Sequence, residues 1–144
     1  MTKVSIVVNC FNGQEYLERC LSSATNQDYA DFEIIFWDNA SQDNSVKIAE
    51  KFSSKKIKIF KSKKNVPLSK ARELALRECS GTWVGFLDVD DAWDTRKLSL
   101  QMMALEGIDD LASKNTAILS CLSRIISSED EILARNIGRP PPTI

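Results

Sequence analysis

Short apolar runs and stretches of helical periodicity alternate four times between residues 4 and 105 of this 144-residue chain. The apolar runs predict strands at residues 4–8, 32–37, 57–60 and 83–87. The stretches between and after them predict helices at 14–27, 68–79 and 94–105, and one helix capped by Ser41 or Asp43 that runs to residue 52. Such alternation is typical of parallel strands joined by crossover helices. The sequence therefore predicts an α/β fold with a mostly parallel sheet flanked by helices.

The residues after 105 show weaker patterns. Residues 116–121 predict a fifth strand and 122–134 a hairpin, whereas the proline-rich tail at 136–144 is expected to be mobile. We interpret residues 1–135 as one domain. The sequence shows neither a signal peptide nor an apolar stretch long enough to span a membrane. These features predict a cytoplasmic protein, which a partner could hold at a membrane.

Three carboxylates follow the fourth predicted strand. Residues 84–91 read Val-Gly-Phe-Leu-Asp-Val-Asp-Asp, so the apolar run ends in Asp88, Asp90 and Asp91. We expect this strand to be buried on both faces, as strands of parallel sheets are. Carboxylates this close repel one another unless a cation lies among them, which indicates a divalent-metal site. A solvated acidic turn before a helix is the alternative, and this segment alone does not separate the two.

Polar residues also follow the first two predicted strands. Asn9 stands at the end of the first strand and Asp38 at the end of the second. In a parallel sheet these ends open on the same side as Asp88, and such sheets bind ligands there. Because two of the three strand ends carry carboxylates, a binding site is favoured over an acidic turn.

Composition and motifs exclude several other kinds of site. The chain has no histidine, which removes His-based triads, bases and metal ligands. A net charge of −1 gives no electrostatic reason to expect a nucleic-acid partner. The first turn lacks the motifs of dinucleotide folds and P-loops, and Trp93 and Ser99 replace the Gly and Glu of a calcium loop. A cation-bridged nucleoside-diphosphate site remains, with Asp38 and Asn39 placed to bond a base or ribose.

Seven segments between residues 4 and 101 form a longer pattern. They are Val-Ser-Ile-Val-Val-Asn-Cys-Phe-Asn-Gly at 4–13, Tyr-Leu-Glu-Arg-Cys-Leu-Ser-Ser at 16–23, Asn-Gln at 26–27, Asp-Phe-Glu-Ile-Ile at 31–35, Asp-Asn-Ala-Ser-Gln-Asp at 38–43, Ala-Arg at 71–72 and Gly-Thr-Trp-Val-Gly-Phe-Leu-Asp-Val-Asp-Asp at 81–91. In this order and spacing they resemble the family 2 glycosyltransferases. The resemblance implies the GT-A (Rossmann-like) fold and a nucleotide-sugar-binding domain over residues 1–135.

The resemblance also implies roles for individual residues. The loop after the first strand would border the nucleotide, and Asp38 with Asn39 would contact uracil or another base. Asp90 is expected on the sugar side, and Asp91 on a Mg²⁺ or Mn²⁺ ion bound to the diphosphate. The implied nucleotide-binding residues are Asn9, Phe11, Asn12, Asp38, Asn39, Arg72, Asp88 and Asp90, and the implied metal ligands are Asp91 and Asp90.

The implied function is transfer of a sugar from a nucleoside-diphosphate sugar, first of all a UDP-sugar, to a hydroxyl of a carbohydrate or lipid-linked acceptor. Such transfer usually inverts the anomeric centre and serves polysaccharide biosynthesis. Family members normally continue well past residue 144, so the acceptor site and the catalytic base are expected beyond it, and the fold is expected to be truncated.

A nucleotide-sugar-binding module without activity is the alternative. A metal-dependent nuclease-type domain fits less well, because it would want a basic surface. Asn39 also stands where many family members have a second Asp.

Overall fold

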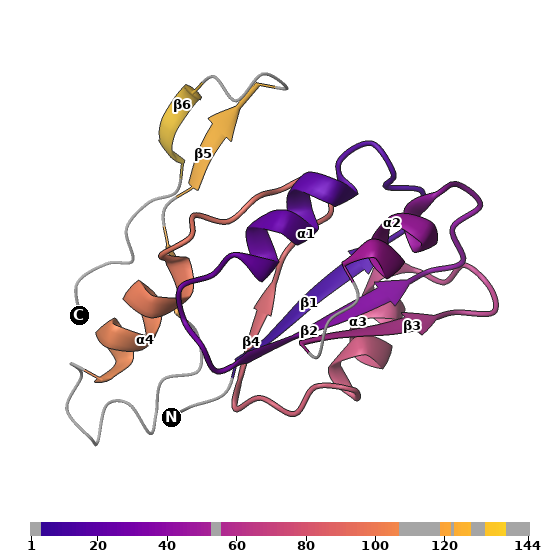
Figure 1. Cartoon of the computed structure of the whole chain (residues 1–144), viewed down its shortest axis with the longest axis horizontal. Coiled ribbons are helices and arrows are strands. Elements are labelled where there is room, and N and C mark those ends of the chain that lie inside the picture. Colours follow the sequence, from indigo (N-terminus) through magenta and orange to yellow (C-terminus); the bar gives the residue numbers. More distant parts are fainter. Residues whose placement is uncertain (1–3, 53–55, 107–118, 122, 128–131, 138–144) are drawn as a thin grey trace. The chain divides into compact units, whose positions relative to one another are not determined.

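The computed structural model describes residues 4–52, 56–106, 119–121, 123–127 and 132–137. Four strands form one parallel sheet: β1 (Val4–Cys10), β2 (Phe32–Asp38), β3 (Ile57–Lys61) and β4 (Trp83–Phe86). Their order across the sheet is β3-β2-β1-β4 (Figure 1). The predicted α/β class with a mostly parallel sheet is confirmed.

Three helices connect the strands and a fourth follows β4: α1 (Leu17–Thr25), α2 (Ser45–Lys51), α3 (Leu68–Leu76) and α4 (Lys97–Glu106). Crossovers between parallel strands are right-handed. The crossovers through α1 and α2 step in one direction across the sheet, whereas the crossover through α3 steps back past β2 and β1. For this reason α1 and α2 cover one face and α3 covers the other (Figure 1). The strand order reverses between β1 and β4, which is where open α/β sheets bind ligands.

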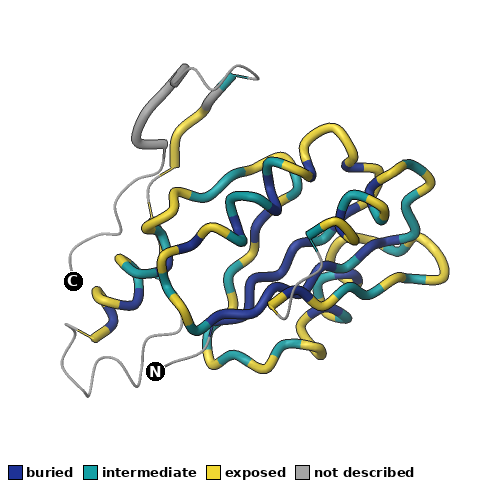
Figure 2. The backbone as a smooth tube through the Cα atoms, viewed as in Figure 1, coloured by how far each residue is buried: buried dark blue, intermediate teal, exposed yellow. Residues whose placement is uncertain are grey.

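Alternate residues of the two central strands form the core on both faces of the sheet. Val7 and Ile35 lie on the α3 face and pack with Ala75, and Trp37 and Phe60 stack beside them with 6.1 Å between ring centroids. The fully buried residues of the other face and its helices include Ile6, Val8, Ile34, Phe36, Leu17 and Leu21. Figure 2 shows this core as a dark-blue band along β1 and β2. Neighbouring strands on both sides explain why these two strands are the most buried.

β4 departs from the prediction that it is buried on both faces. Val84 and Phe86 lie on the α3 face and are 37% and 43% exposed. The prediction is wrong because α3 lies over β1 and β2, and β4 is the edge strand of the described sheet. The opposite face is closed by Trp93, whose ring would come within 2.7 Å of a Cβ added at Gly85. Glycine at this position therefore makes room for the indole ring on the strand.

Several element boundaries also differ from the predictions, and two of them lie on either side of the β1–α1 loop. β1 extends to Cys10 because it pairs with β2 along its full length. α1 begins at Leu17 and not at residue 14, because a turn precedes it in which the N–H groups of Tyr16 and Leu17 both donate to the carbonyl oxygen of Gly13, at 3.1 and 3.0 Å. The connection between β1 and α1 therefore begins after Cys10, and α1 begins later in the chain than the sequence predicts.

The second compact unit, Glu106–Ile144, contains an antiparallel hairpin of β5 (Ser123–Ile126) and β6 (Ile132–Ile137). The hairpin predicted at 122–134 is confirmed, and its second strand continues to Ile137. The strand predicted at 116–121 is not formed at 119–121, whereas 116–118 and the tail from 138 lie outside the described residues. The domain boundary at residue 135 stays a prediction. None of the described helices has the length and apolar character that a membrane span needs.

Candidate functional site

The carboxyl ends of β1, β2 and β4 bring the predicted site residues to one edge of the sheet. Cys10 at the end of β1 pairs with Asp38 at the end of β2. The segment that begins at Asp88 follows β4, which lies on the other side of β1. The prediction that these strand ends open onto the same side is confirmed by the parallel pairing.

A tight turn gathers the three carboxylates that follow β4. The N–H of Asp91 donates to the carbonyl oxygen of Asp88 at 3.0 Å, which closes the turn. A Cβ added at Gly13 would lie 2.7 Å from Val89 Cγ2, so glycine allows the β1–α1 loop to pack directly on the turn. Burial, together with the charges of Asp90 and Asp88, raises the pKa of Asp91. Repulsion among three carboxylates is expected of a site that receives a cation.

The donor chemistry of this turn suits a hard cation. Within the described residues, no group of three or more His, Cys, Asp or Glu side chains is placed to hold a metal ion by itself. Mg²⁺ is usually bound through one or two carboxylates together with phosphate oxygens of a ligand, and not by an all-protein cage. Asp90 and Asp91 meet that requirement. The residues present therefore fit a Mg²⁺ or Mn²⁺ ion that is shared with a diphosphate.

Arg72 of α3 reaches the acidic turn. Its Nη2 donates to Asp88 Oδ1 at 2.7 Å. Its guanidinium carbon lies 5.2 Å from the centroid of the Phe86 ring, within the range of a cation–π interaction. Arg72 Nε is buried and has no hydrogen-bond partner among the described residues. The predicted basic residue and the first predicted carboxylate thus form an ion pair at the end of β4.

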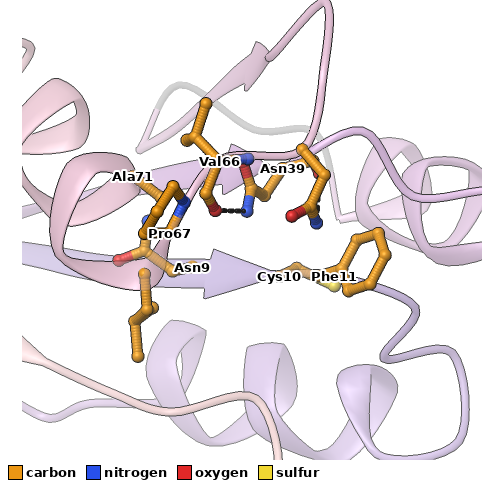
Figure 3. Close-up of a pocket in the computed structure, with 9 residues that line it drawn as sticks. Asn9, Cys10, Phe11, Asn39, Val66, Pro67 and Ala71 are labelled. Carbon is orange, nitrogen blue, oxygen red and sulfur yellow. Dashed lines mark hydrogen bonds between the residues drawn. The ribbon is translucent and has the colours of Figure 1, made fainter.

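A pocket of about 290 Å³ opens beside the end of β1 (Figure 3). Its lining residues come from the ends of β1 and β2, the β3–α3 loop and α3: Asn9, Cys10, Phe11, Asn39, Asn65, Val66, Pro67, Leu68 and Ala71. Most of these side chains are apolar, and the Phe11 ring is half exposed. Asn9 Nδ2 is buried without a hydrogen-bond partner in the described part of the chain. A mainly apolar wall with an unpaired donor suits a flat ring that carries a carbonyl oxygen.

Asn39 holds the β3–α3 loop that forms one wall of this pocket. Its Nδ2 donates to the carbonyl oxygen of Val66 at 2.7 Å (Figure 3). Its Oδ1 accepts from the Val66 N–H at 3.1 Å. An aspartate here could accept from the N–H but could not donate to the carbonyl. The amide therefore has structural partners in this structure, and its contact with a base stays a prediction.

Replacing Asn39 with Asp is expected to lower the free energy of unfolding by about 2 kcal/mol, because a buried carboxylate would face the Val66 carbonyl oxygen with no donor between them. Urea unfolding of the variant and the wild type measures this loss. Asn65→Asp is the matched control: the exposed Asn65 donates to the Asn39 carbonyl oxygen at 3.3 Å, so we expect a smaller loss. Equal stability of Asn39→Asp and the wild type would contradict the structural role.

Side-chain hydrogen bonds join the β1–α1 loop to the β2–α2 loop. The Asn12 N–H donates to Ser41 Oγ at 2.9 Å, and Asn12 Oδ1 accepts from the Gln42 N–H at 2.8 Å. The Gln14 N–H donates to Asp43 Oδ2 at 3.0 Å. Asn12 has a φ of 52°, a left-handed conformation that asparagine adopts more readily than most residues. Asn12 thus holds the two loops together at this edge, and the contact with the nucleotide that the family resemblance implies for it stays a prediction.

Asp38 lies beneath the β2–α2 loop and is 3% exposed. Its two carboxylate oxygens accept from the Ser41 N–H at 3.2 and 3.3 Å. Ala40 between them has a φ of 66°, which lets the chain fold back onto the carboxylate. Asp38 does not line the pocket. Its predicted contact with a base stays a prediction.

The structure brings together some of the predicted residues and adds others. Asn9, Phe11 and Asn39 share one pocket, and Arg72 meets Asp88 in an ion pair. The lining residues contributed by the β3–α3 loop and α3 were missed: Asn65, Val66, Pro67, Leu68 and Ala71. The sequence could have indicated them, because the loop after the third strand of a parallel sheet must begin at the same edge of the sheet as the loops after the first two.

Comparisons with known proteins identify the family that the chain matches. The family described as Glycosyl transferase family 2 matches residues 5–129 of the chain. The chain is 41% identical over 100 residues to a cholesterol galactosyltransferase of Borreliella burgdorferi. The match covers 68% of this chain and 28% of that protein. It is 33% identical over 99 residues to a UDP-Glc:alpha-D-GlcNAc-diphosphoundecaprenol beta-1,3-glucosyltransferase of Escherichia coli, with 69% and 39% covered.

Among solved structures, the chain is similar to residues 1–349 of S. aureus TarS in complex with UDP-GlcNAc. The TM-score is 0.68 at 30% sequence identity, and the match covers 72% of this chain and 30% of the other. The matched regions make up 28% and 39% of the two curated relatives, so the chain spans well under half of their length.

Proposed function

This chain belongs to glycosyl transferase family 2, and from that premise we propose that it binds a nucleoside-diphosphate sugar through a divalent metal, for transfer of the sugar to an acceptor hydroxyl. The predicted GT-A fold is confirmed by the parallel sheet and by the likeness to TarS. Residues 1–135 are the proposed nucleotide-sugar-binding domain. A UDP-sugar is the proposed donor, because UDP stands in the names of the E. coli relative and of the TarS complex.

The observation that carries the proposal is an acidic turn and a mainly apolar pocket at the same edge of the sheet. A nucleoside diphosphate has matching parts: a flat base for the pocket, and a charged diphosphate that a cation can join to carboxylates. Asp91, with Asp90 beside it, is the proposed ligand of Mg²⁺ or Mn²⁺. When bound, the ion would offset the charge that develops on the diphosphate as the bond to the sugar breaks.

The nucleotide is proposed to meet residues of β1, β2, α3 and the acidic turn. Asn9 offers an unpaired amide donor, and Phe11 an exposed ring on which a base could stack. The remaining proposed nucleotide-site residues are Asn12, Asp38, Asn39, Arg72, Asp88 and Asp90. Asn12 and Asn39 would act by holding the loops that frame the site, since hydrogen bonds already engage their side chains.

The acceptor is proposed to be a carbohydrate or lipid-linked hydroxyl. The E. coli relative is named for a diphosphoundecaprenol-linked sugar and the B. burgdorferi relative for cholesterol. We propose inversion at the anomeric centre, with a base outside residues 1–144 that deprotonates the hydroxyl. We further propose that the protein is cytoplasmic and that a partner brings it to a membrane-held acceptor.

A thermal-shift panel tests donor binding. The 144-residue chain is heated with UDP, GDP, ADP or CDP, each in Mn²⁺ and in EDTA. We expect UDP with Mn²⁺ to raise the Tm and UDP with EDTA to raise it much less, because ligands that bind only the folded chain stabilise it. If no nucleoside diphosphate raises the Tm, donor binding is wrong. Release of free sugar from a UDP-sugar then separates turnover from binding alone.

A further inference from the structure

We infer that Asp88 is a positioning residue, which holds the Arg72 guanidinium in place for the nucleotide and does not bind the metal. The inference rests on the proposed function and assigns the carboxylates of the turn to two different tasks. Asp90 and Asp91 serve the cation, and Asp88 serves the arginine.

The two sides of Asp88 face different helices. Its carbonyl oxygen accepts a weak hydrogen bond from Cys20 Sγ of α1, at 3.6 Å. Its carboxylate is bound by Arg72 Nη2 of α3, at 2.7 Å. Phe86 ends β4 two residues earlier, and the same guanidinium lies over its ring. Phe86 and Asp88 therefore form one seat for the guanidinium, with the ring centroid 5.2 Å from its central carbon.

The ion pair removes Asp88 from the carboxylates available to a cation. Arginine is protonated at every physiological pH, so a metal ion at Asp88 would have to displace a permanent positive charge. Neither Asp90 nor Asp91 forms an ion pair within the part of the chain that the structure describes. A cation is therefore expected at these two carboxylates.

Arg72 still has a donor to offer. Its Nε is buried and has no partner among the described residues, and a buried unpaired donor is unfavourable unless a ligand completes it. Asp88 and Phe86 hold the guanidinium at two points. The direction of its Nε–H is therefore fixed as well. A planar group held in this way suits an oxygen atom of a nucleoside diphosphate. Without Asp88 the positive charge would stay and its orientation would be lost.

A second ion pair on α3 provides the control. Arg77 Nη2 lies 2.6 Å from Glu73 Oε1, an i,i+4 pair at the end of the helix. Both side chains are more exposed than Arg72. Glu73 Oε2 also lies 2.8 Å from Lys70 Nζ. Glu73→Gln therefore removes both contacts and changes the charge of the same helix, but it leaves the Arg72–Asp88 pair in place.

The experiment measures two affinities by isothermal titration: UDP at saturating Mn²⁺, and Mn²⁺ at saturating UDP. The variants are Asp88→Asn, Asp88→Glu, Arg72→Gln, the Asp88→Asn/Arg72→Gln double variant and Glu73→Gln. We expect Asp88→Asn and Arg72→Gln each to weaken UDP binding roughly tenfold, as for one charge-assisted hydrogen bond. The double variant should bind no more weakly than Arg72→Gln, since the two residues act as one unit.

The other variants give the specific readouts. The Mn²⁺ affinity of Asp88→Asn should equal that of the wild type. Asp88→Glu should bind UDP more tightly than Asp88→Asn, because it keeps the carboxylate. Glu73→Gln should bind UDP and Mn²⁺ as the wild type does. The pair is partly exposed, so the melting temperatures should stay close.

Four outcomes would overturn the inference. Weaker Mn²⁺ binding by Asp88→Asn would make Asp88 a metal ligand. Effects of the single variants that multiply in the double variant would make the two residues independent. Wild-type UDP affinity in Asp88→Asn would leave the positioning role without support while donor binding stands. If the wild type binds no nucleoside diphosphate, the proposed function fails and the inference falls with it.

Discussion

Replacing Asp91 with Asn is expected to abolish the Mn²⁺-dependent part of UDP binding. We expect the UDP affinity at saturating Mn²⁺ to fall by at least about 100-fold, because the loss of a direct metal ligand should exceed the effect of losing an outer-shell partner. Asparagine keeps the size of the side chain but removes the charge and one of the carboxylate oxygens that hard cations prefer. Without the cation, the diphosphate would meet the negative charge of the turn directly. Calorimetric titration with UDP in Mn²⁺ and in EDTA measures the loss.

The same substitution should not destabilise the metal-free chain. Burial, with the charges of Asp90 and Asp88, raises the pKa of Asp91, so its ionised form is less favourable in the folded chain than in the unfolded one. At low pH the carboxyl is protonated in both states and this penalty is absent; it appears as the pH rises through the folded-state pKa. We therefore expect Asp91→Asn to gain thermal stability relative to the wild type as the pH rises from acid to neutral.

Two further variants complete this test. Glu18→Gln removes an exposed carboxylate in the first turn of α1 and should leave UDP binding unchanged. Asp90→Asn should weaken the metal-dependent part less than Asp91→Asn. Metal-dependent binding that survives intact in Asp91→Asn would contradict the assignment of Asp91 as the principal ligand.

The sheet could be predicted from the sequence because its elements follow local rules. Apolar runs and helical spacing define each strand and helix without reference to distant residues, and the handedness of crossovers then fixes the arrangement of the helices. The positions of Asn9, Asp38 and Asp88 at one edge follow from the same rules, since parallel strands end on the same side. The family resemblance added roles to these positions, which periodicity alone does not supply.

Contacts between distant loops could not be predicted in the same way. Asn39 and Val66 are 27 residues apart, and Asn12 and Gln42 are 30 apart. The sequence around Asn39 does not distinguish an amide that contacts a ligand from one that holds a loop, because both need a donor and an acceptor. The exposure of Phe86 was missed for a related reason: it depends on which strands α3 covers, and helical periodicity does not reveal that.

Glu33 is a buried carboxylate of β2 on which several elements converge. Its Oε1 accepts from Ser5 Oγ at 2.7 Å and from the N–H and hydroxyl of Ser80 at 2.6 and 2.7 Å. Its Oε2 lies 2.9 Å from Lys58 Nζ. Burial alone would raise the pKa of Glu33, but hydrogen bonds from Ser80, Lys58 and Ser5 outweigh it and hold that pKa well below its usual range. The carboxylate thus links β1, β2, β3 and the segment before β4.

Replacing Glu33 with Gln is expected to lower the free energy of unfolding by about 3 kcal/mol at neutral pH, because the new NH₂ group must face a donor, either the lysine or the serine groups. The carboxylate of the wild type contributes fully above pH 4.5, the ordinary pKa of the side chain, and its contribution is lost as the pH falls further. Urea unfolding across this range should show the gap between variant and wild type shrinking below pH 4.5. Lys58→Gln removes only a half-exposed ammonium and should lose less. A gap that stays constant in acid would mean that the shape of the side chain, and not its charge, stabilises the fold.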